Sequence, residues 1–303
     1  MKSLNDNIEI LSAPSILGLK PTGVEELGES LLAAGLAAKL KCIHPVIHVP
    51  TLNSLYNDKR DPETNCLNPI PLRDFFLTLG KAISATINNS RFPFVLGGDC
   101  SILLGIFSAL KVKANYGLIF LDAHADFYEP EKSITGEVAD MDLAILTGRG
   151  PALLTNINHQ RPYVKNENVI HIGQRDWEET RKYGSRDIRE TTINCIPLAD
   201  IESKGMHNTC TEVLQTMNQI DVEGFWIHFD TDVLSDEINP AVDYRLPGGL
   251  QFQQTEYLLR TLLLTGRITG ISVTIFNPKL DPDKIISNNI AESLGRAFDL
   301  SGG

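Results

Sequence analysis

Short apolar segments alternate with longer amphipathic segments along most of the chain. The apolar segments are rich in Val, Ile and Phe and carry few charges, which is typical of parallel strands buried on both faces. We predict about eight such strands, at residues 8–13, 45–49, 92–96, 117–121, 168–172, 192–196, 225–229 and 270–275. Between them, apolar residues recur with the helical period of about 3.6 residues. This pattern predicts helices at residues 24–40, 72–87, 102–111, 141–147, 210–217, 254–264 and 289–300.

The alternation of strands and helices predicts a doubly wound, mostly parallel α/β sheet with helices on both faces. Two polar stretches, residues 50–73 and 150–167, are expected to be loops rather than domain linkers, because the alternation resumes after each. The sequence has no internal repeat, so we predict a single domain over residues 1–303. A division into an N-terminal half packed against a C-terminal half stays open.

Composition narrows the class of protein. Of the 303 residues, 42% are hydrophobic and 21% are charged, as in soluble globular proteins. A formal net charge of −11 argues against nucleic acid or an acidic membrane as a partner. It fits either plain solubility or a carboxylate-lined pocket whose excess charge bound divalent cations would partly neutralise. The five cysteines show no paired spacing, and the N-terminus lacks the apolar core of a signal peptide. We therefore predict a cytoplasmic protein without disulfide bonds.

The first cluster of candidate site residues is Asp122-Ala123-His124-Ala125-Asp126, directly after a predicted strand. Residues two apart in an extended chain point to the same side, so the two carboxylates and the imidazole should converge. Ligands bind at this carboxyl end of the strands in open α/β sheets. Carboxylates with imidazole suit divalent metals. The alternative is that these polar residues only end the strand and cap the next helix.

A second apolar segment ends in acidic residues two apart, in His228-Phe229-Asp230-Thr231-Asp232. Two carboxylates buried side by side are unfavourable unless a cation or a proton is present. The alternative is that Asp232 caps a turn while Asp230 pairs with a Lys or Arg. His228 has the same parity as these residues and could partly substitute for a missing metal ligand, although we expect it to lie too deep in the strand for that role. One bridging pair of metal ions would satisfy both acidic clusters.

The third cluster is Gly97-Gly98-Asp99-Cys100-Ser101, between a predicted strand and a predicted helix. The glycines permit a tight turn, and Asp99 or Ser101 can cap the helix. Cys100 is expected to point into the crevice. A lone cysteine in such a place is more often a small buried residue than a ligand.

Three motifs, in this order and with this spacing, resemble the metal motifs of the ureohydrolase family, which includes arginase, agmatinase and formiminoglutamase. They are Gly97-Gly98-Asp99-Cys100-Ser101, Asp122-Ala123-His124-Ala125-Asp126 and Asp230-Thr231-Asp232. Further segments also resemble this family: Gly23-Val24-Glu25-Glu26, Ala33-Ala34-Gly35-Leu36, Ile172-Gly173-Gln174-Arg175-Asp176, Pro247-Gly248-Gly249-Leu250 and Asn277-Pro278. The resemblance implies a three-layer α/β/α fold around a mostly parallel, eight-stranded sheet. It also implies homo-oligomers, as trimers, hexamers or dimers, and two manganese ions bridged by hydroxide that hydrolyse a C–N bond in a guanidinium or amidine.

The resemblance also assigns roles to the metal ligands. Asp122 and Asp230 would bridge both metals. Cys100 and Asp126 would complete one metal, and His124 and Asp232 would complete the other. Asp126 would in addition hold and relay the proton of the bridging water, which makes it a candidate catalytic residue.

Two departures from the family affect the metal site and proton transfer. Cys100 stands where the family usually has His, and a softer thiolate favours zinc, iron or nickel over manganese. Ala139 stands where arginases have a proton-shuttle His. Asp140 is next to it, so we predict that Asp140 takes over the shuttle.

Three further departures concern the substrate. Ile275 stands where the family has a guanidinium-binding Glu, and burying a guanidinium without a counter-charge is unfavourable. Tyr128 replaces an Asn of arginases and would narrow the entrance, whereas Glu178 replaces an Asp and can still hold an ammonium group. We therefore predict a substrate other than arginine.

The leading hypothesis is a hydrolase of a non-peptide C–N bond in a small guanidine, amidine or amide. The alternative is a catalytically inactive subunit or binding protein with a degraded metal site, as suggested by Cys100, Ala139 and Ile275 together. A deacetylase of related fold would require a different, His-rich motif, which the sequence lacks.

Overall fold

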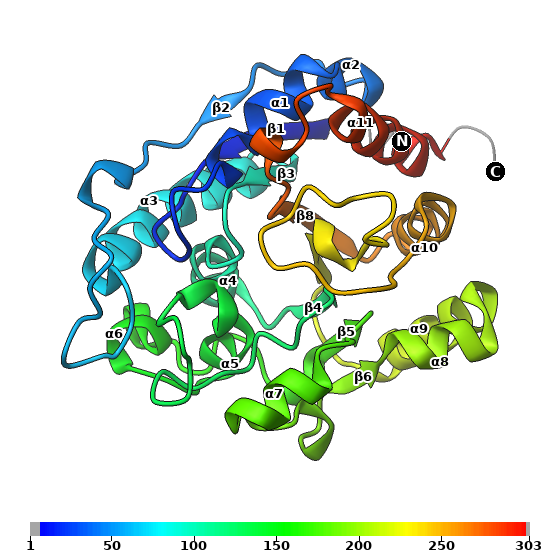
Figure 1. The fold of residues 1–303 in the computed structure, drawn as a ribbon. Coiled ribbons are helices and arrows are strands. Elements are labelled where there is room, and N and C mark those ends of the chain that lie inside the picture. The colour runs from blue at the N-terminus through cyan, green and yellow to red at the C-terminus, as the bar shows by residue number, and fades with distance from the viewer. Residues whose placement is uncertain (1–6, 301–303) are drawn as a thin grey trace.

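The computed structural model describes residues 7–300 and contains one central parallel sheet (Figure 1). Its strand order is β2-β1-β3-β8-β7-β4-β5-β6. The strands are β1 (Ile8–Ala13), β2 (Ile47–His48), β3 (Phe92–Gly97), β4 (Gly117–Leu121), β5 (Val169–Ile172), β6 (Asn194–Ile196), β7 (Phe225–Asp230) and β8 (Ile268–Thr274). The predicted eight strands are confirmed, with ends that shift by a few residues. The largest shift is at β2, which keeps only two residues of the expected five.

Helices cover both faces of the sheet (Figure 1). They are α1 (Leu27–Ala33), α2 (Leu36–Lys39), α3 (Pro69–Asn88), α4 (Ile102–Lys113), α5 (Asp142–Leu146), α6 (Ala152–Thr155), α7 (Trp177–Tyr183), α8 (Leu198–Lys204), α9 (Met206–Gln219), α10 (Phe252–Leu264) and α11 (Ile285–Phe298). Alternate residues of β4 face two separate cores: Ile119 and Leu121 pack with α1, α2 and α8 to α11, whereas Leu118 and Phe120 pack with α3 to α6. The predicted α/β/α layering is confirmed.

Burial explains why the inner strands are apolar runs. Every residue of β1, β3, β4, β5 and β7 is buried, because helices cover both faces of these strands. The short edge strands β2 and β6 are partly exposed. Short edges limit pairing with other chains.

One predicted helix is broken, helix α7 was not predicted, and one predicted loop ends early. The expected helix over residues 24–40 breaks because Gly35 adopts a left-handed conformation with φ 82° between α1 and α2. Helix α7 buries only Thr180, so it has no apolar period that the sequence could reveal. The expected loop at 50–73 ends at Asn68, because Pro69 occupies the first turn of α3, where its fixed φ and missing N–H are tolerated.

Within residues 7–300, no helix is both long and apolar enough to cross a membrane. All five cysteines are free thiols, as predicted.

Candidate metal centre

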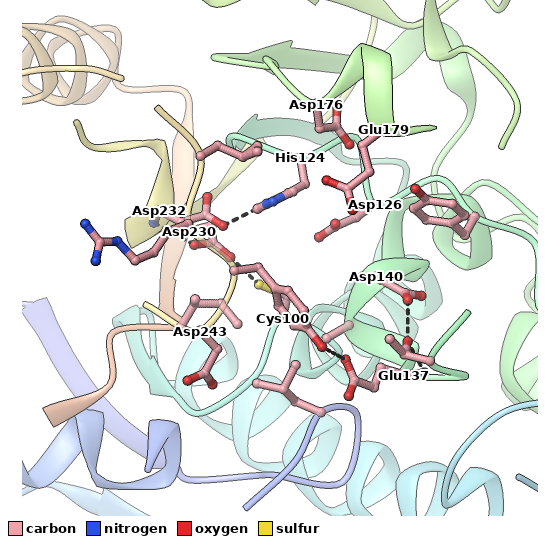
Figure 2. A pocket seen from close by; sticks show the side chains of 18 of the residues that line it. Cys100, His124, Asp126, Glu137, Asp140, Asp176, Glu179, Asp230, Asp232 and Asp243 are labelled. Atoms are coloured by element: carbon pink, nitrogen blue, oxygen red, sulfur yellow. Dashed lines mark hydrogen bonds and ion pairs between the residues drawn. The ribbon is translucent and has the colours of Figure 1, made fainter. Parts of the chain in front are cut away.

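The register of the sheet brings the acidic clusters together. Leu121 of β4 pairs with Phe229 of β7, so Asp122 and Asp230 follow on neighbouring strands at the same level. Strand β8 separates β7 from β3, whose exit turn carries Cys100. These parallel strands all end at one edge of the sheet, where a cavity of about 330 Å³ opens (Figure 2). This is the edge at which the sequence predicts a ligand site.

We call six residues the floor of this cavity: Cys100, Asp122, His124, Asp126, Asp230 and Asp232. All but Asp122 line the cavity directly. Asp122 is fully buried and belongs to two groups of possible metal ligands, one with Cys100, His228 and Asp230 and one with His124 and Asp126. In each group, one donor atom per residue lies within 4.8 Å of the others. Asp122 is therefore the residue the two groups share.

Asp122 and Asp232 meet at His124. The Nδ1 atom of His124 lies 2.8 Å from Oδ2 of Asp232 and 3.7 Å from Oδ1 of Asp122. Burial opposes a charged imidazole, but the two carboxylates outweigh it and raise the pKa of His124 well above its ordinary value. The backbone N–H of His124 also donates to Asp122 Oδ1 (2.7 Å). The other oxygen, Oδ2, is buried without a hydrogen-bond partner in the described chain.

The path of residues 122–126 differs from the expected one. Strand β4 ends at Leu121, and Asp126 has a left-handed φ of 44°, so these side chains converge from a loop and not from an extended strand. Asp176 holds the loop, since its Oδ2 accepts a hydrogen bond from the Ala125 N–H (3.0 Å). A non-glycine residue at positive φ costs about 1–3 kcal/mol and is typical of functional sites.

Cys100 lies on the turn after β3, which requires Gly98. A Cβ atom at Gly98 would stand 1.9 Å from the carbonyl oxygen of Ser15. The thiol of Cys100 donates to Asp230 Oδ2 (2.7 Å) and lies 3.2 Å from Thr274 Oγ1. Burial, together with the charge of Asp230, raises the pKa of Cys100 well above its ordinary value. Without a cation the thiol is therefore neutral.

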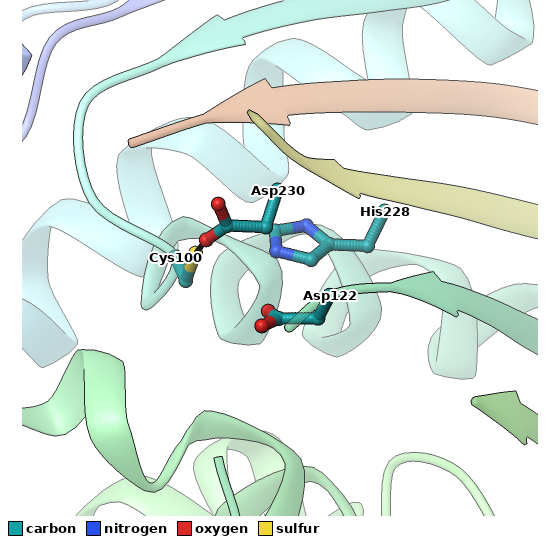
Figure 3. Close-up of side chains that lie close together, drawn as sticks. All are labelled: Cys100, Asp122, His228 and Asp230. Carbon is teal, nitrogen blue, oxygen red and sulfur yellow. Dashed lines mark hydrogen bonds between the residues drawn. The ribbon is translucent and has the colours of Figure 1, made fainter. Parts of the chain in front are cut away.

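His228 corrects an expectation. Strand β7 continues through Asp230, so the two residues project from the same face. The imidazole is fully buried, and it lies among Cys100, Asp122 and Asp230, as Figure 3 shows. The expectation that it lies too deep was wrong, because the ring is long enough to reach along the strand to the level of the ligands.

Buried charge is the main electrostatic feature of the floor. Burial, reinforced by Asp232, raises the pKa of Asp122 to about 7. Burial and neighbouring carboxylates also raise the pKa values of Asp126 and Asp230 well above their ordinary range. A divalent cation reverses this balance by favouring the ionised forms. The unpartnered Oδ2 of Asp122 and the mixed oxygen, nitrogen and sulfur donors fit such a cation.

A model of the arginase family matches residues 32–298. The arginase of Staphylococcus aureus (strain COL) is 31% identical to the chain in an alignment of 300 residues that covers 96% of each protein. The chain belongs to the arginase family of hydrolases. The crystal structure of arginase from Bacillus subtilis has a TM-score of 0.84 to it at 26% identity, covering 97% of this chain and 99% of that one. Formimidoylglutamase from Bacillus subtilis subsp. subtilis str. 168 shares the fold, with a TM-score of 0.71 at 17% identity, covering 98% of this chain and 91% of that one.

Membership of the arginase family confirms the resemblance seen in the sequence. It also makes a binuclear site for divalent metal ions the expected content of the floor, which carries two groups of possible ligands. All six predicted ligands lie together there.

The remaining residues around the cavity form what we call the wall: Leu19, Tyr128, Ile134, Thr135, Glu137, Ala139, Asp140, Asp176, Glu179, Tyr183, Asp243, Tyr244, Arg245, Leu246 and Ile275. Predicted substrate residues Tyr128 and Ile275 are among them. Ile275 has φ 73°, a genuine outlier for a β-branched residue. Asp140 accepts hydrogen bonds from Ser133 (2.9 Å) and Thr135 (2.6 Å). Burial raises its pKa to about 7, and these bonds only partly oppose the shift.

Glu178 is not part of the wall, so this prediction was wrong. Helix α7 begins at Trp177, and its helical period turns Glu179 and Tyr183 toward the cavity. Both glutamates are exposed, but Glu178 does not line the cavity. Asp176, just before the helix, also lines the cavity (Figure 2). The sequence near Glu178 has no apolar periodicity from which the side of the helix that faces the cavity could be predicted.

Glu137 was not singled out from the sequence. It is fully buried, lies 2.8 Å from Lys20 Nζ and accepts a hydrogen bond from the hydroxyl of Tyr244 (2.8 Å). Glu137 thus has a cationic partner already. No sequence signal links it to Lys20, since the two are distant along the chain.

Proposed function

We propose that the chain hydrolyses a non-peptide C–N bond in a small guanidine, amidine or amide other than arginine, in a metal-dependent reaction. The observation that carries this proposal is the convergence of all six floor residues around the buried Asp122. Of the changes relative to the sequence pattern of arginases, those at Tyr128, Ala139 and Ile275 lie in the wall, whereas Cys100 lies in the floor and Glu178 does not line the cavity. A protein that had lost its reaction would have no reason to keep the acidic floor.

Divalent ions held by the floor, either manganese or, because of Cys100, zinc, iron or nickel, would supply an acidified water as the nucleophile. Asp126 is buried but still faces the cavity, where it can accept a proton from that water. Asp140 is the candidate to pass the proton on. With a pKa raised to about 7, its carboxyl group can take up and release a proton near neutral pH.

The wall supports a substrate other than arginine. Ile275 offers no charge to a guanidinium, and Glu137, a buried carboxylate of the wall, is paired with Lys20. A cationic head group at these two residues would therefore lose water without gaining a free counter-charge. Glu179 and Asp176 remain available to a more distant amino group of the substrate.

One observation favours a second candidate, a catalytically inactive subunit or binding protein. The thiol of Cys100 donates to Asp230 Oδ2. Asp230 would need this oxygen as a metal ligand if it bridges both ions. If this hydrogen bond persists, it weakens the site.

Elemental analysis before and after dialysis against a chelator, combined with a hydrolysis screen of guanidines, amidines and amides, separates these candidates. About two tightly bound divalent ions per chain with metal-dependent release of ammonia, an amine or urea support the hydrolase. Less than one ion per chain with no turnover of any compound supports the inactive protein.

A further inference from the structure

We propose that His228 is a direct metal ligand, which joins Cys100, Asp122 and Asp230 in one deep position with sulfur, nitrogen and oxygen donors. This inference rests on the proposed function in so far as both require metal in the floor. It assigns a ligand that lies outside the motifs on which the family resemblance depends.

The four donor atoms are close enough to surround one ion. They come from β7 and from the segments that directly follow β3 and β4. All four side chains are buried, and each donor lies within 4.8 Å of the others (Figure 3). Metal–donor bonds of about 2.0–2.3 Å in a tetrahedral site place donors about 3.3–3.8 Å apart. The observed cluster therefore has to contract by only about 1 Å. The unpartnered Asp122 Oδ2 is a second, independent sign that a ligand is required.

The surroundings of His228 leave Nε2 for the metal. Its Nδ1 lies 2.9 Å from Ser272 Oγ, whereas Nε2 lies 3.4 Å from Thr274 Oγ1. That same hydroxyl is 3.2 Å from the Cys100 Sγ, so nitrogen and sulfur approach a common point. A proton on Nδ1 that is donated to Ser272 leaves Nε2 as an acceptor, which is the usual arrangement of a ligating histidine. In this structure that acceptor faces the Thr274 hydroxyl at 3.4 Å, a long contact that a metal ion would replace.

Ser272 can support this arrangement. Its oxygen already accepts a hydrogen bond from Trp226 Nε1 (3.1 Å), and a hydroxyl oxygen has a second lone pair for His228. Stacking on Phe120, with ring centroids 5.0 Å apart and planes at 21°, fixes the orientation of the imidazole.

The two metal positions would then differ in chemistry. The deep position has a thiol and an imidazole, which favour zinc, cobalt or iron over manganese. The shallow position would have His124, Asp126 and Asp232, and it keeps mainly oxygen donors, which suit manganese. This grouping follows the observed cluster of Asp122, His124 and Asp126, and it differs from the resemblance, which pairs Asp126 with Cys100 on one metal.

His171 provides a matched control. It is also fully buried and also packs against Phe120, at 5.1 Å between centroids. Its Nε2 instead contacts the carbonyl oxygen of His124 (2.7 Å), and it belongs to neither ligand group.

The test measures zinc affinity by competition with a chromophoric chelator, and the visible spectrum of the cobalt-loaded protein. The full chain is compared with its His228→Ala, His228→Gln and His171→Gln variants. Substitution of a residue that only positions a metal ligand typically weakens metal affinity by about 10- to 100-fold. We therefore expect both His228 variants to bind zinc more than about 100-fold more weakly and to change the cobalt spectrum. His171→Gln should leave the spectrum unchanged and affect affinity less.

A smaller loss of affinity, or an unchanged cobalt spectrum, in the His228 variants would overturn the inference. Thermal unfolding of the chelator-treated proteins identifies a variant that does not fold. His228→Gln keeps a polar side chain of similar size and decides the question if His228→Ala unfolds. If the unmodified chain binds zinc and only the His228 prediction fails, the proposed function stands. If the unmodified chain binds neither zinc nor manganese, the proposed function fails as well.

Discussion

The floor of the cavity is built where β3, β4 and β7 end, whereas its wall comes mainly from loops and the short helix α7. Strand pairing fixes the floor, since Leu121 and Phe229 are paired in register and so place Asp122 beside Asp230. Loops have fewer such constraints and accept substitutions more readily. The floor keeps five of the six ligands that the family resemblance implies, with Cys100 as the exception, whereas the wall has Ile275 where the resemblance implies a guanidinium-binding Glu. This difference suggests that the floor sets the type of reaction and the wall selects the substrate.

The largest expected effect is in the floor, from Asp122→Asn. Because Asp122 is shared by both ligand groups, its loss should weaken metal binding more than about 100-fold and abolish any hydrolysis. Asp243→Asn in the wall is the control and should retain the metal. Metal content by elemental analysis checks both variants. Unchanged metal content in Asp122→Asn would remove the distinction between floor and wall.

A second change in the floor, Cys100→His, should alter metal preference. Replacing a soft sulfur donor by an imidazole should shift the ratio of manganese to zinc affinity toward manganese by about tenfold or more. Competition titrations with both metals measure the ratio. Cys210→Ser removes another buried thiol, far from the cavity, and should change nothing. An unaltered ratio in Cys100→His would mean that Cys100 is not a ligand.

In the wall, Ile275→Glu should create a site for a guanidinium. A charge-assisted hydrogen bond contributes about 1.5–3 kcal/mol, so we expect the KM for a guanidine substrate such as arginine or agmatine to fall about tenfold or more. Ile275→Gln has the same size without the charge and should not show this gain. Equal behaviour of the two variants would contradict the proposed role of Ile275 in excluding these substrates.

Substitutions of the neighbouring residues Glu178 and Glu179 test which side of α7 faces the cavity. Only Glu179 faces the cavity, and an exposed carboxylate is worth less than about 1 kcal/mol. Glu179→Ala should therefore raise the KM about two- to fivefold, with little change in kcat, once a substrate is known. Glu178→Ala should match the unmodified protein. The reverse pattern would show that the helix presents its other side.

The smallest effect concerns Asp140 and pH. Its pKa is raised from an ordinary 3.8 to about 7, chiefly by burial, so the folded state holds this proton more tightly than the unfolded state. The stability that it contributes is complete below pH 4 and is lost as pH rises through about 7. Asp140 is partly exposed to the cavity, which limits the loss to about 1 kcal/mol.

Denaturant unfolding of the chelator-treated protein checks this expectation. Asp140→Asn cannot ionise, so its stability relative to the unmodified protein should increase between pH 4.5 and pH 8. A difference that is constant with pH would show that Asp140 has an ordinary pKa.

The sequence by itself determined the sheet and most of the floor. Buried parallel strands must be continuous apolar runs, so β1, β3, β4 and β7 were visible as such. Acidic residues directly after two of these runs are costly to bury without a cation or a proton. Asp122 and Asp230 were therefore recognisable as site residues. The break at Gly35 was not visible, because the periodic pattern continues across it.

Only the tertiary structure decided which side chains meet across elements. Glu137 and Lys20 pair although they are distant along the chain, and local periodicity carries no information on such contacts. The phase of α7, which selects Glu179 over Glu178, depends on where the helix begins. The reach of His228 toward the ligands depends on the depth at which three strands end, a property of their packing and not of any one segment.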